Sequence, residues 1–252
     1  MPLEAPLPIA RERAAELNAR YRHHGARDIL AHALSDPLTG RIAMVSSFGA
    51  ESVVLLHLLA TLDRTVPVLF LNTEMLFEET LIYQKQVAEK LRLTDVQVIS
   101  PDRTELFLED NDAMLWRKST DDCCALRKTR PLEKALDGFD AWITGRKRYQ
   151  SGTRAQMDLF EADGDSRIKV NPMAHFTPDD IREYIENNNL PRHPLVKKGF
   201  ASLGCAPCTS RVRDGEDPRA GRWRGQDKSE CGIHFENGKM VRTPVAQSGE
   251  VF

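Results

Sequence analysis

The spacing of apolar residues changes along the chain between a helical period and short continuous runs. Residues 9–35 carry apolar side chains at helical spacing, which predicts two helices separated near Gly25. Beyond them, short runs rich in Val, Ile and Leu predict buried strands, and the longer stretches between the runs predict helices. We expect strands over 41–46, 66–72, 96–100, 141–145 and 168–172. We expect helices over 51–62, 78–93, 115–136 with a break in the sequence STDD, and 177–188 with a capping box between Thr177 and Asp180.

This alternation of strands and helices predicts an α/β fold, a single domain with a mostly parallel, twisted sheet flanked by helices. Ligands of such sheets bind beyond the carboxyl ends of the strands, where the strand order reverses. The loops 46–52, 72–77 and 145–154 are therefore the candidate ligand loops. We expect N-terminal helices over 1–40, the α/β domain over 41–208 and a flexible C-terminal tail over 209–252, because this last segment holds six glycines and few large apolar residues.

Composition and charge exclude several classes of protein. The chain has 252 residues, of which 41% are hydrophobic and 29% charged, as in soluble globular proteins. Its net charge of −2 does not favour nucleic-acid binding. No apolar run approaches the roughly 20 residues of a membrane span, and the N-terminus lacks the layout of a signal peptide. We therefore expect a cytoplasmic protein that binds neither nucleic acid nor membrane.

Four of the five cysteines form two close pairs. Cys123 and Cys124 are adjacent, and about 80 residues later Cys205 and Cys208 form a Cys-x-x-Cys motif. Four thiolates in two pairs can hold zinc or a 4Fe–4S cluster. An adjacent Cys-Cys pair is unusual for zinc ribbons, whose paired ligands are a few residues apart, so the pattern favours the cluster. Zinc, or four thiols without a metal, are the alternatives.

The fifth cysteine, Cys231, lies in the segment KSECGIH (228–234) within the Gly-rich, charged part of the chain. A thiol in such a segment is expected to be accessible to solvent rather than part of a core. Lys228 and His234 would favour its thiolate form, and Glu230 would oppose it. Cys231 is therefore a candidate nucleophile, and the alternative is an incidental surface thiol.

The loop 46–52 and two basic clusters indicate an anion site. The loop follows a predicted strand and opens a predicted helix, where backbone N–H groups and small hydroxyl side chains can bind an anion. It is not a Walker loop, and an ordinary strand-to-helix turn is the alternative. The basic clusters at 146–154 and 219–224, with Lys128, can neutralise a small polyanion, unless they are two solvated loops. The first cluster follows a strand, at the ligand-binding edge of the sheet.

Taken together, these segments resemble the assimilatory sulfonucleotide reductases, and specifically the cluster-containing adenylyl-sulfate (APS) reductases. The loop 46–52 by itself is similar to the modified phosphate loop of the adenine nucleotide α-hydrolase superfamily, although its second Gly and its Asp are absent. The matching segments span about 190 residues and are SSFGAESVVLLHL (46–58), LNTE (71–74), CCALRK (123–128), TGRKRYQSGTR (144–154), GCAPCT (204–209), GRW (221–223) and KSECGIH (228–234).

The resemblance implies an adenine nucleotide α-hydrolase-like fold, one 4Fe–4S cluster, and thioredoxin-dependent reduction of APS to sulfite and AMP in sulfate assimilation for cysteine biosynthesis. A cysteine thiolate attacks the sulfonate sulfur and expels AMP, and thioredoxin then releases sulfite from the S-sulfocysteine. A homo-oligomer is also implied. By position, the resemblance assigns catalytic roles to Cys231, Lys128 and His234; cluster ligation to Cys123, Cys124, Cys205 and Cys208; and substrate binding to Ser47, Phe48, Gly49, Leu71, Gly145, Arg154, Arg219 and Arg222.

Three alternative functions compete with this one. The first is reduction of the 3′-phosphorylated substrate PAPS, whose strict reductases generally lack both cysteine pairs. The second is a tRNA-thiolating ATP-pyrophosphatase, which the incomplete Gly-Gly-x-Asp pattern and the nearly neutral net charge disfavour. The third is an iron–sulfur sensor without catalysis, which would leave the phosphate loop and Cys231 unexplained.

Overall fold

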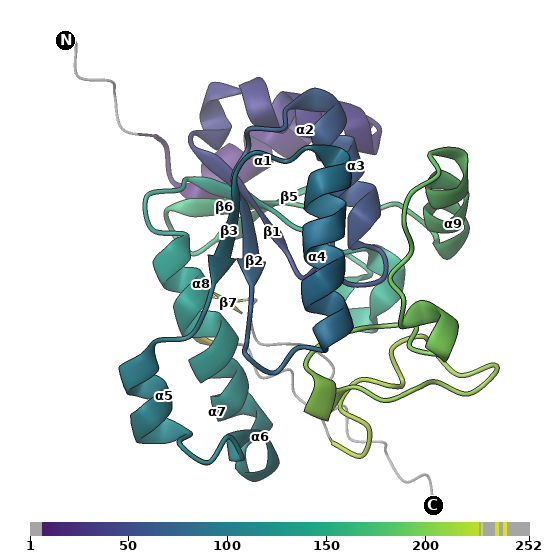
Figure 1. Cartoon of the computed structure of the whole chain (residues 1–252). Helices are drawn as coiled ribbons and strands as arrows, with labels where there is room; N and C mark the ends of the chain where they lie inside the picture. The colour runs from purple at the N-terminus through teal and green to yellow at the C-terminus, as the bar shows by residue number, and fades with distance from the viewer. Residues whose placement is uncertain (1–6, 227, 229–234, 237–238, 241–252) are drawn as a thin grey trace, which may run out of the picture.

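A six-stranded sheet forms the centre of this computed structural model, which describes residues 7–226, 228, 235–236 and 239–240 (Figure 1). The strand order is β3-β2-β1-β4-β6-β5. All neighbouring strands pair in parallel except β5, which pairs antiparallel with β6 at one edge. The strands are β1 (Ile42–Ser46), β2 (Val68–Leu71), β3 (Val96–Ile99), β4 (Ala141–Ile143), β5 (Phe160–Asp163) and β6 (Arg167–Val170).

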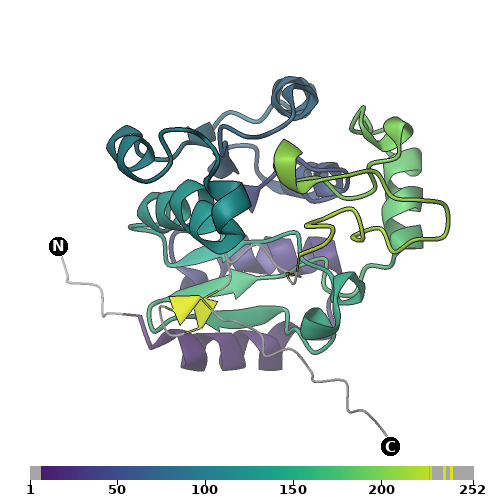
Figure 2. The same cartoon turned by 90° about the horizontal axis from the view of Figure 1, so that it is seen from below.

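Helices cover both faces of the sheet, as the parallel pairing requires. The larger core receives side chains from α1 (Ala10–Tyr21), α2 (Ala26–Ser35), α3 (Ser52–Leu62), α4 (Glu78–Leu91) and α9 (Pro178–Asn187). The smaller core lies under α8 (Arg130–Ala135). Successive residues of β2 alternate between the cores: Val68 and Phe70 belong to the larger, Leu69 and Leu71 to the smaller. Figure 2 shows the purple N-terminal helix and the teal helices of residues 103–135 on opposite sides of the sheet.

The region between β3 and β4 is helical but interrupted. It contains α5 (Arg103–Glu109), α6 (Leu115–Lys118), α7 (Thr120–Cys124), a π-helical segment Ala125–Thr129 and α8. The predicted break in the sequence STDD is confirmed at Ser119, whose extended backbone ends α6 and whose hydroxyl accepts a hydrogen bond from the Asp122 N–H (3.2 Å). The π-helical turn follows the Cys123-Cys124 pair directly, and such turns are frequent at functional sites.

Most elements predicted from the apolar pattern are confirmed, and the α/β fold with its mostly parallel sheet is the observed one. The capping box of α9 is present, with reciprocal hydrogen bonds between Thr177 and Asp180. Among the helices and strands described, α5, β5 and the antiparallel pair β7 (Phe235–Glu236) and β8 (Lys239–Met240) were not predicted. The helix α5 is only seven residues long and leaves Phe107 and Leu108 exposed, so it lacks an amphipathic period. The strand β5 has the sequence FEAD, whose two acidic residues interrupt the apolar run by which the other strands were predicted.

The first part of the predicted tail is packed against the domain. The Val212 N–H donates to the Gly199 carbonyl (3.0 Å), and the Ser210 N–H donates to the Gly221 carbonyl (2.8 Å). Trp223 is 2% exposed, and its N–H donates to the Cys208 carbonyl (3.0 Å). Residues 209–226 therefore differ from the loose segment expected there, because one buried tryptophan and these backbone hydrogen bonds hold them. Most of the remaining tail lies outside the described residues.

Within the described part of the chain, none of the helices combines the length and the apolar composition needed to cross a membrane.

A buried histidine makes folding stability dependent on pH. His193 is 0% exposed; its Nδ1 accepts from the Leu195 N–H (3.2 Å), so its Nε2 carries the proton and donates to the Thr80 hydroxyl (3.0 Å). Burial lowers the pKa of His193 to about 4. Because the unfolded chain binds this proton near pH 6.5, the stabilisation is complete above that pH and is lost as the pH falls through 6.5 towards 4.

We predict that the titration of His193 alone reduces the free energy of unfolding by about 2 kcal/mol as the pH falls from 7.5 to 5. Urea unfolding of the parent and of His193→Gln at both pH values measures this difference. The Gln variant is less stable at pH 7.5 but loses less stability at pH 5, since its side chain does not titrate. An equal loss in both proteins would contradict the assignment.

Candidate functional site

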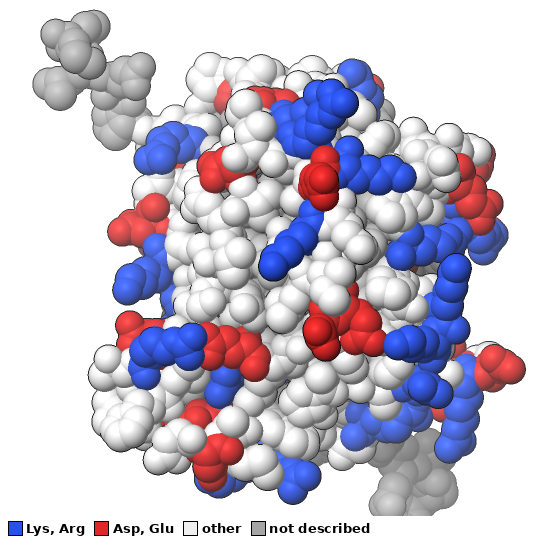
Figure 3. Space-filling view, viewed as in Figure 1, with Lys and Arg blue, Asp and Glu red and all other residues white. Residues whose placement is uncertain are grey.

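A cavity of about 340 Å³ lies at the carboxyl ends of β1, β2 and β4. The strand order reverses between β1 and β4, so this is the position where open α/β sheets bind ligands. Figure 1 places the segment 200–226, in green to yellow, at the same end of the sheet. Basic side chains gather over this segment on the molecular surface (Figure 3). The cavity walls combine apolar side chains, among them Leu55, Leu71, Trp142, Met173 and Leu203, with the basic residues Lys128, Arg146, Lys147, Arg154, Arg219 and Arg222.

The loop after β1 is fixed by its own hydroxyl groups. The Phe48 N–H donates to Ser46 Oγ (3.2 Å), and the Gly49 N–H donates to Ser52 Oγ (3.0 Å). Phe48 adopts a left-handed backbone (φ 46°), and its ring is fully buried at right angles to Phe70, 5.2 Å between centroids. Ser47 and Gly49 line the cavity, whereas the Phe48 side chain is buried in the larger core and holds the loop there. The predicted residues Ser47, Gly49, Leu71 and Gly145 thus come together at one wall.

Glu51 and Lys147 form an ion pair inside the cavity. Lys147 Nζ donates to Glu51 Oε2 (2.6 Å), the Tyr149 hydroxyl to Oε1 (2.8 Å) and Gln150 Nε2 to Oε2 (3.2 Å). Burial would raise the pKa of Glu51, but the Lys147 ammonium and the other donated hydrogen bonds hold that pKa below its usual value. Burial lowers the pKa of Lys147, and Glu51 opposes this shift. Arg154 Nη1 donates to Gln150 Oε1 (2.5 Å), so it belongs to the same network.

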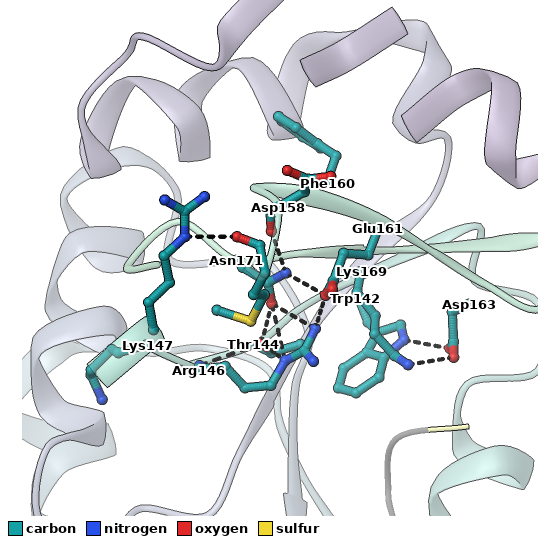
Figure 4. A network of polar contacts seen from close by, with 12 residues as sticks. Trp142, Thr144, Arg146, Lys147, Asp158, Phe160, Glu161, Asp163, Lys169 and Asn171 are labelled. Carbon is teal, nitrogen blue, oxygen red and sulfur yellow. Dashed lines mark hydrogen bonds and ion pairs between the residues drawn. The ribbon is translucent and has the colours of Figure 1, made fainter. Parts of the chain in front are cut away.

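Arg146 is held from the other side by Glu161 of β5 and by Asn171, the residue that follows β6 (Figure 4). Its guanidinium donates to Asn171 Oδ1 from Nη2 (3.0 Å) and Nε (3.2 Å), and it pairs with Glu161 of β5. The Thr144 hydroxyl donates to the same Asn171 oxygen (2.7 Å), and Asn171 Nδ2 donates to Glu161 Oε2 (2.8 Å). The loop after β4 is therefore bonded both to the start of α3 and to the edge of the sheet.

Arg222 lies in a narrow space next to the Cys-x-x-Cys motif. Its guanidinium lies over the Trp223 ring, 4.4 Å from the centroid, and its Nη1 donates to the Leu203 carbonyl (2.8 Å). A Cβ at Gly204 would lie 2.3 Å from Arg222 Nη2, so the guanidinium has this position because residue 204 has no side chain. Because Arg154, Arg219 and Arg222 all line the cavity, the structure brings together the three arginines that the sequence indicated.

The four paired cysteines lie beside this cavity. Cys123, Cys124 and Cys205 are buried and Cys208 is half-buried, and none of these four described cysteines forms a disulfide bond. The turn that carries Cys205 and Cys208 is joined to the loop after β2, since the Ala206 N–H donates to the Met75 carbonyl (2.7 Å). Burial, followed by the neighbouring Cys124 and Cys205, raises the pKa of Cys123 to about 12. Thiols of the two pairs therefore act on one another across more than 80 residues of sequence.

These residues are compatible with an iron–sulfur cluster. Soft thiolates favour iron–sulfur clusters, zinc and copper(I) as partners. In the part of the chain that the structure describes, no three Cys, His, Asp or Glu side chains surround one metal-ion position. A cubane does not require this, because each thiolate binds a different iron atom. The surroundings also offer a hydroxyl next to sulfur, since the Thr73 hydroxyl lies 3.2 Å from Cys205 Sγ.

Lys128 belongs to both parts of the site. It lines the cavity, and together with Arg222 it opposes the rise that burial and the neighbouring thiols cause in the pKa of Cys208. Cys231 and His234 lie outside the described residues. The neighbouring Lys228 is described: its Nζ donates to Asp121 Oδ1 (2.6 Å), at the start of the helix that carries Cys123 and Cys124.

Among the charged residues that line the cavity, Glu51, Arg146 and Lys147 were given no role from the sequence. Arg146 and Lys147 stand in the basic cluster after β4, from which only Arg154 was chosen. The available signal was the acidic Glu51 at the end of a presumed anion loop, since a carboxylate there needs a cationic partner.

The family model and the curated relatives indicate one family. The model of the phosphoadenosine phosphosulfate reductase domain matches residues 41–211. The adenosine 5′-phosphosulfate reductase of Mesorhizobium japonicum is 46% identical over 234 residues, covering 93% of this chain and 92% of its own. That of a Chelativorans species is also 46% identical, covering 91% and 94%. The solved phosphoadenylyl-sulfate reductase of Candida auris shares the fold, with a TM-score of 0.69 and 22% identity over 82% of this chain and all of that one.

We predict that Gly221→Ala loosens the segment that carries Arg219 and Arg222. An added Cβ would lie 2.2 Å from the Ser210 carbonyl oxygen, which is backbone and cannot move aside alone. Overpacking of this kind costs about 1–3 kcal/mol, which makes local opening roughly 5- to 150-fold more frequent. Limited trypsin digestion measures it as faster cleavage at Arg211, Arg213 and Arg219.

The control is Gly152→Ala, because a Cβ there meets nothing within 4 Å. Equal cleavage rates in the two variants would show that the crossing of residues 210 and 221 does not hold the segment.

Proposed function

The chain belongs to the phosphoadenosine phosphosulfate reductase family, and on that premise we propose that it reduces adenosine 5′-phosphosulfate (APS) to sulfite and AMP with thioredoxin as the reductant. The observation that carries the proposal is the shared position of two features. A cavity lined by cations lies next to two cysteine pairs, and Lys128 and Arg222 act on both.

The cavity suits an adenine nucleotide with a charged tail. Its volume of about 340 Å³ lies within the range of small-molecule sites, and its apolar walls can take a planar base. The basic residues Lys128, Arg154, Arg219 and Arg222 can neutralise the phosphate and sulfonate groups. This combination favours a small anionic nucleotide over the tRNA substrate of a thiolating enzyme.

APS is favoured over PAPS for two reasons. Relatives that are 46% identical over more than nine-tenths of the chain are named as reductases of adenosine 5′-phosphosulfate. The chain also has both cysteine pairs, which strict PAPS reductases generally lack. PAPS is the alternative substrate, and the assay below compares the two.

We infer that Cys231 is the nucleophile, an assignment that rests on its sequence segment. Its thiolate attacks the sulfonate sulfur; an S–S bond forms, the S–O bond to phosphate breaks, and AMP leaves with the electron pair. The charge that develops on the AMP phosphate needs fixed cations, a role that suits Lys128, Arg219 and Arg222, with His234 as a further catalytic group.

Thioredoxin completes the reaction by thiol exchange. Its thiolate attacks Cys231 Sγ, the S–S bond to the sulfonate breaks, and sulfite leaves with the electron pair. The second thiol of thioredoxin then resolves the mixed disulfide and releases the Cys231 thiol. The two electrons that reduce the sulfonate therefore come from the dithiol, which is consistent with a reducing, cytoplasmic location.

We also propose that Cys123, Cys124, Cys205 and Cys208 hold one 4Fe–4S cluster. A bound cluster supplies a fixed anionic iron–sulfur group beside the cations of the cavity, and no electron of the reaction is assigned to it. The support is the soft donor set, the mutual influence of the thiols and the Thr73 hydroxyl beside Cys205. The homo-oligomer implied by the family resemblance stays a prediction.

The purified protein should contain about four irons per chain, because each thiolate of a cubane binds one iron. Cys208→Ser should lose iron and activity, whereas Cys231→Ser should keep its iron, so it serves as the matched control. Elemental analysis decides the matter, and one zinc without iron would refute the cluster.

Wild-type protein, purified without oxygen, should release sulfite from APS when thioredoxin is present, and faster than from PAPS. Cys231→Ser should keep nucleotide binding but lose sulfite release, since serine is a far weaker nucleophile than a thiolate.

Incubation of the wild-type protein with APS and no reductant should add one sulfonate mass to the peptide that contains Cys231. Normal turnover by the Ser variant, or the added mass on one of the paired cysteines, would show that the proposed chemistry is wrong.

A further inference from the structure

Glu51 is a carboxylate in a cavity whose other charged groups are mostly cations. Its two oxygens accept hydrogen bonds from Lys147, Tyr149 and Gln150, all in the loop after β4. A carboxylate repels an anionic ligand, so its presence in an anion site calls for a specific role. The ion pair with Lys147, at 2.6 Å and with the Lys147 side chain 4% exposed, is the strongest of these contacts.

Apart from that carboxylate, burial and the nearby charges all disfavour the ammonium form of Lys147. Besides Glu51 at the start of α3, it faces Arg154 of the turn after β4 and Arg219 of the segment 209–226, and both arginines disfavour its ammonium form. Burial disfavours the ammonium form as well, and burial is the largest influence. Glu51 is the group that opposes both effects.

We propose that Glu51 is a positioning residue that keeps Lys147 as a buried ammonium, so that Lys147 binds the anionic tail of the nucleotide. This inference rests on the proposed function, because it assumes that the cavity holds a nucleotide. An ammonium has three N–H donors, and among the described residues Glu51 is the acceptor bonded to Lys147 Nζ. A ligand phosphate oxygen can therefore share this ammonium with Glu51.

Glu51 is also connected to Arg154 through the side chain of Gln150. Gln150 donates to Glu51 through its amide nitrogen (3.2 Å) and accepts from Arg154 through its amide oxygen (2.5 Å). A purely structural role for Glu51 would therefore affect binding at every pH, whereas the charge-holding role affects it only where Lys147 can lose its proton. The pH dependence of binding separates the two roles.

The test measures the dissociation constants of AMP and of uncharged adenosine by calorimetry between pH 6 and pH 9.5. All proteins carry Tyr149→Phe as a common background, so that the hydrogen bond from the Tyr149 hydroxyl to Glu51 Oε1 is missing from the parent and the variants alike. The parent of this background is compared with Glu51→Gln and Lys147→Met. Taking the ratio of variant to parent at each pH cancels the protonation of AMP itself.

For AMP, the ratio for Glu51→Gln should stay under about 3-fold at pH 6 and rise to roughly 10-fold or more at pH 9.5, as Lys147 loses its proton. Lys147→Met should weaken AMP binding roughly 10- to 100-fold, the value of a charge-assisted hydrogen bond, without this rise. Adenosine binding should stay near the parent value in both variants.

A loss in Glu51→Gln that is equal at all pH values, or equal for AMP and adenosine, would overturn the charge-holding role. Unchanged AMP binding in Lys147→Met would overturn it even if Glu51→Gln failed to fold. A parent that binds neither AMP nor adenosine would instead overturn the proposed function.

Discussion

Positive charge held inside the protein is the constraint on which the structure depends. An unpaired buried charge costs several kcal/mol, and a carboxylate within hydrogen-bond distance offsets that cost for three of the buried cations. Arg127 donates to Asp110 from Nη2 (2.6 Å) and Nε (3.0 Å), and Lys169 pairs with Asp163 (2.8 Å). Together with the pair of Lys147 and Glu51, these contacts join separate segments of the chain: the π-helical turn to the end of α5, β6 to β5, and the loop after β4 to the start of α3.

Each pair also defines where a functional loop lies. Arg127 donates to the Thr73 carbonyl (3.0 Å), so its pairing with Asp110 connects the π-helical turn after the cysteine pair to the loop after β2. Thr73 in turn touches Cys205, which brings the second cysteine pair to the first. The antiparallel edge strand β5 supplies Glu161 and Asp163, whose partners are Arg146 and Lys169. The acidic residues of β5 are therefore part of what positions the cavity.

The parallel sheet could be predicted from the sequence because apolar runs report burial on both faces, and most boundaries agree within a few residues. The strand β5 and the packing of residues 209–226 could not, because they depend on partners distant in sequence. From the sequence, Glu161 would be taken for a polar surface residue; its contacts with Arg146 and Asn171 become known only from the structure. The same limit explains why the resemblance found Arg154 and Arg222 but passed over Glu51 and Lys147, whose importance lies in their mutual contact.

The nearness of the cysteine pairs to the cavity raises an electrostatic problem that the structure answers locally. Four thiolates, with or without iron, carry negative charge, and a nucleotide with a phosphate and a sulfonate carries more. In a partly buried site these anions would repel each other strongly, because the low dielectric weakens screening. Lys128 and Arg222 line the cavity and favour the thiolate of Cys208, so the same two cations compensate both groups. Arg222 lies in the space that the absent side chain of Gly204 leaves, and Cys205 is the next residue. A movement of the cysteine motif would therefore also move the surroundings of this cavity arginine.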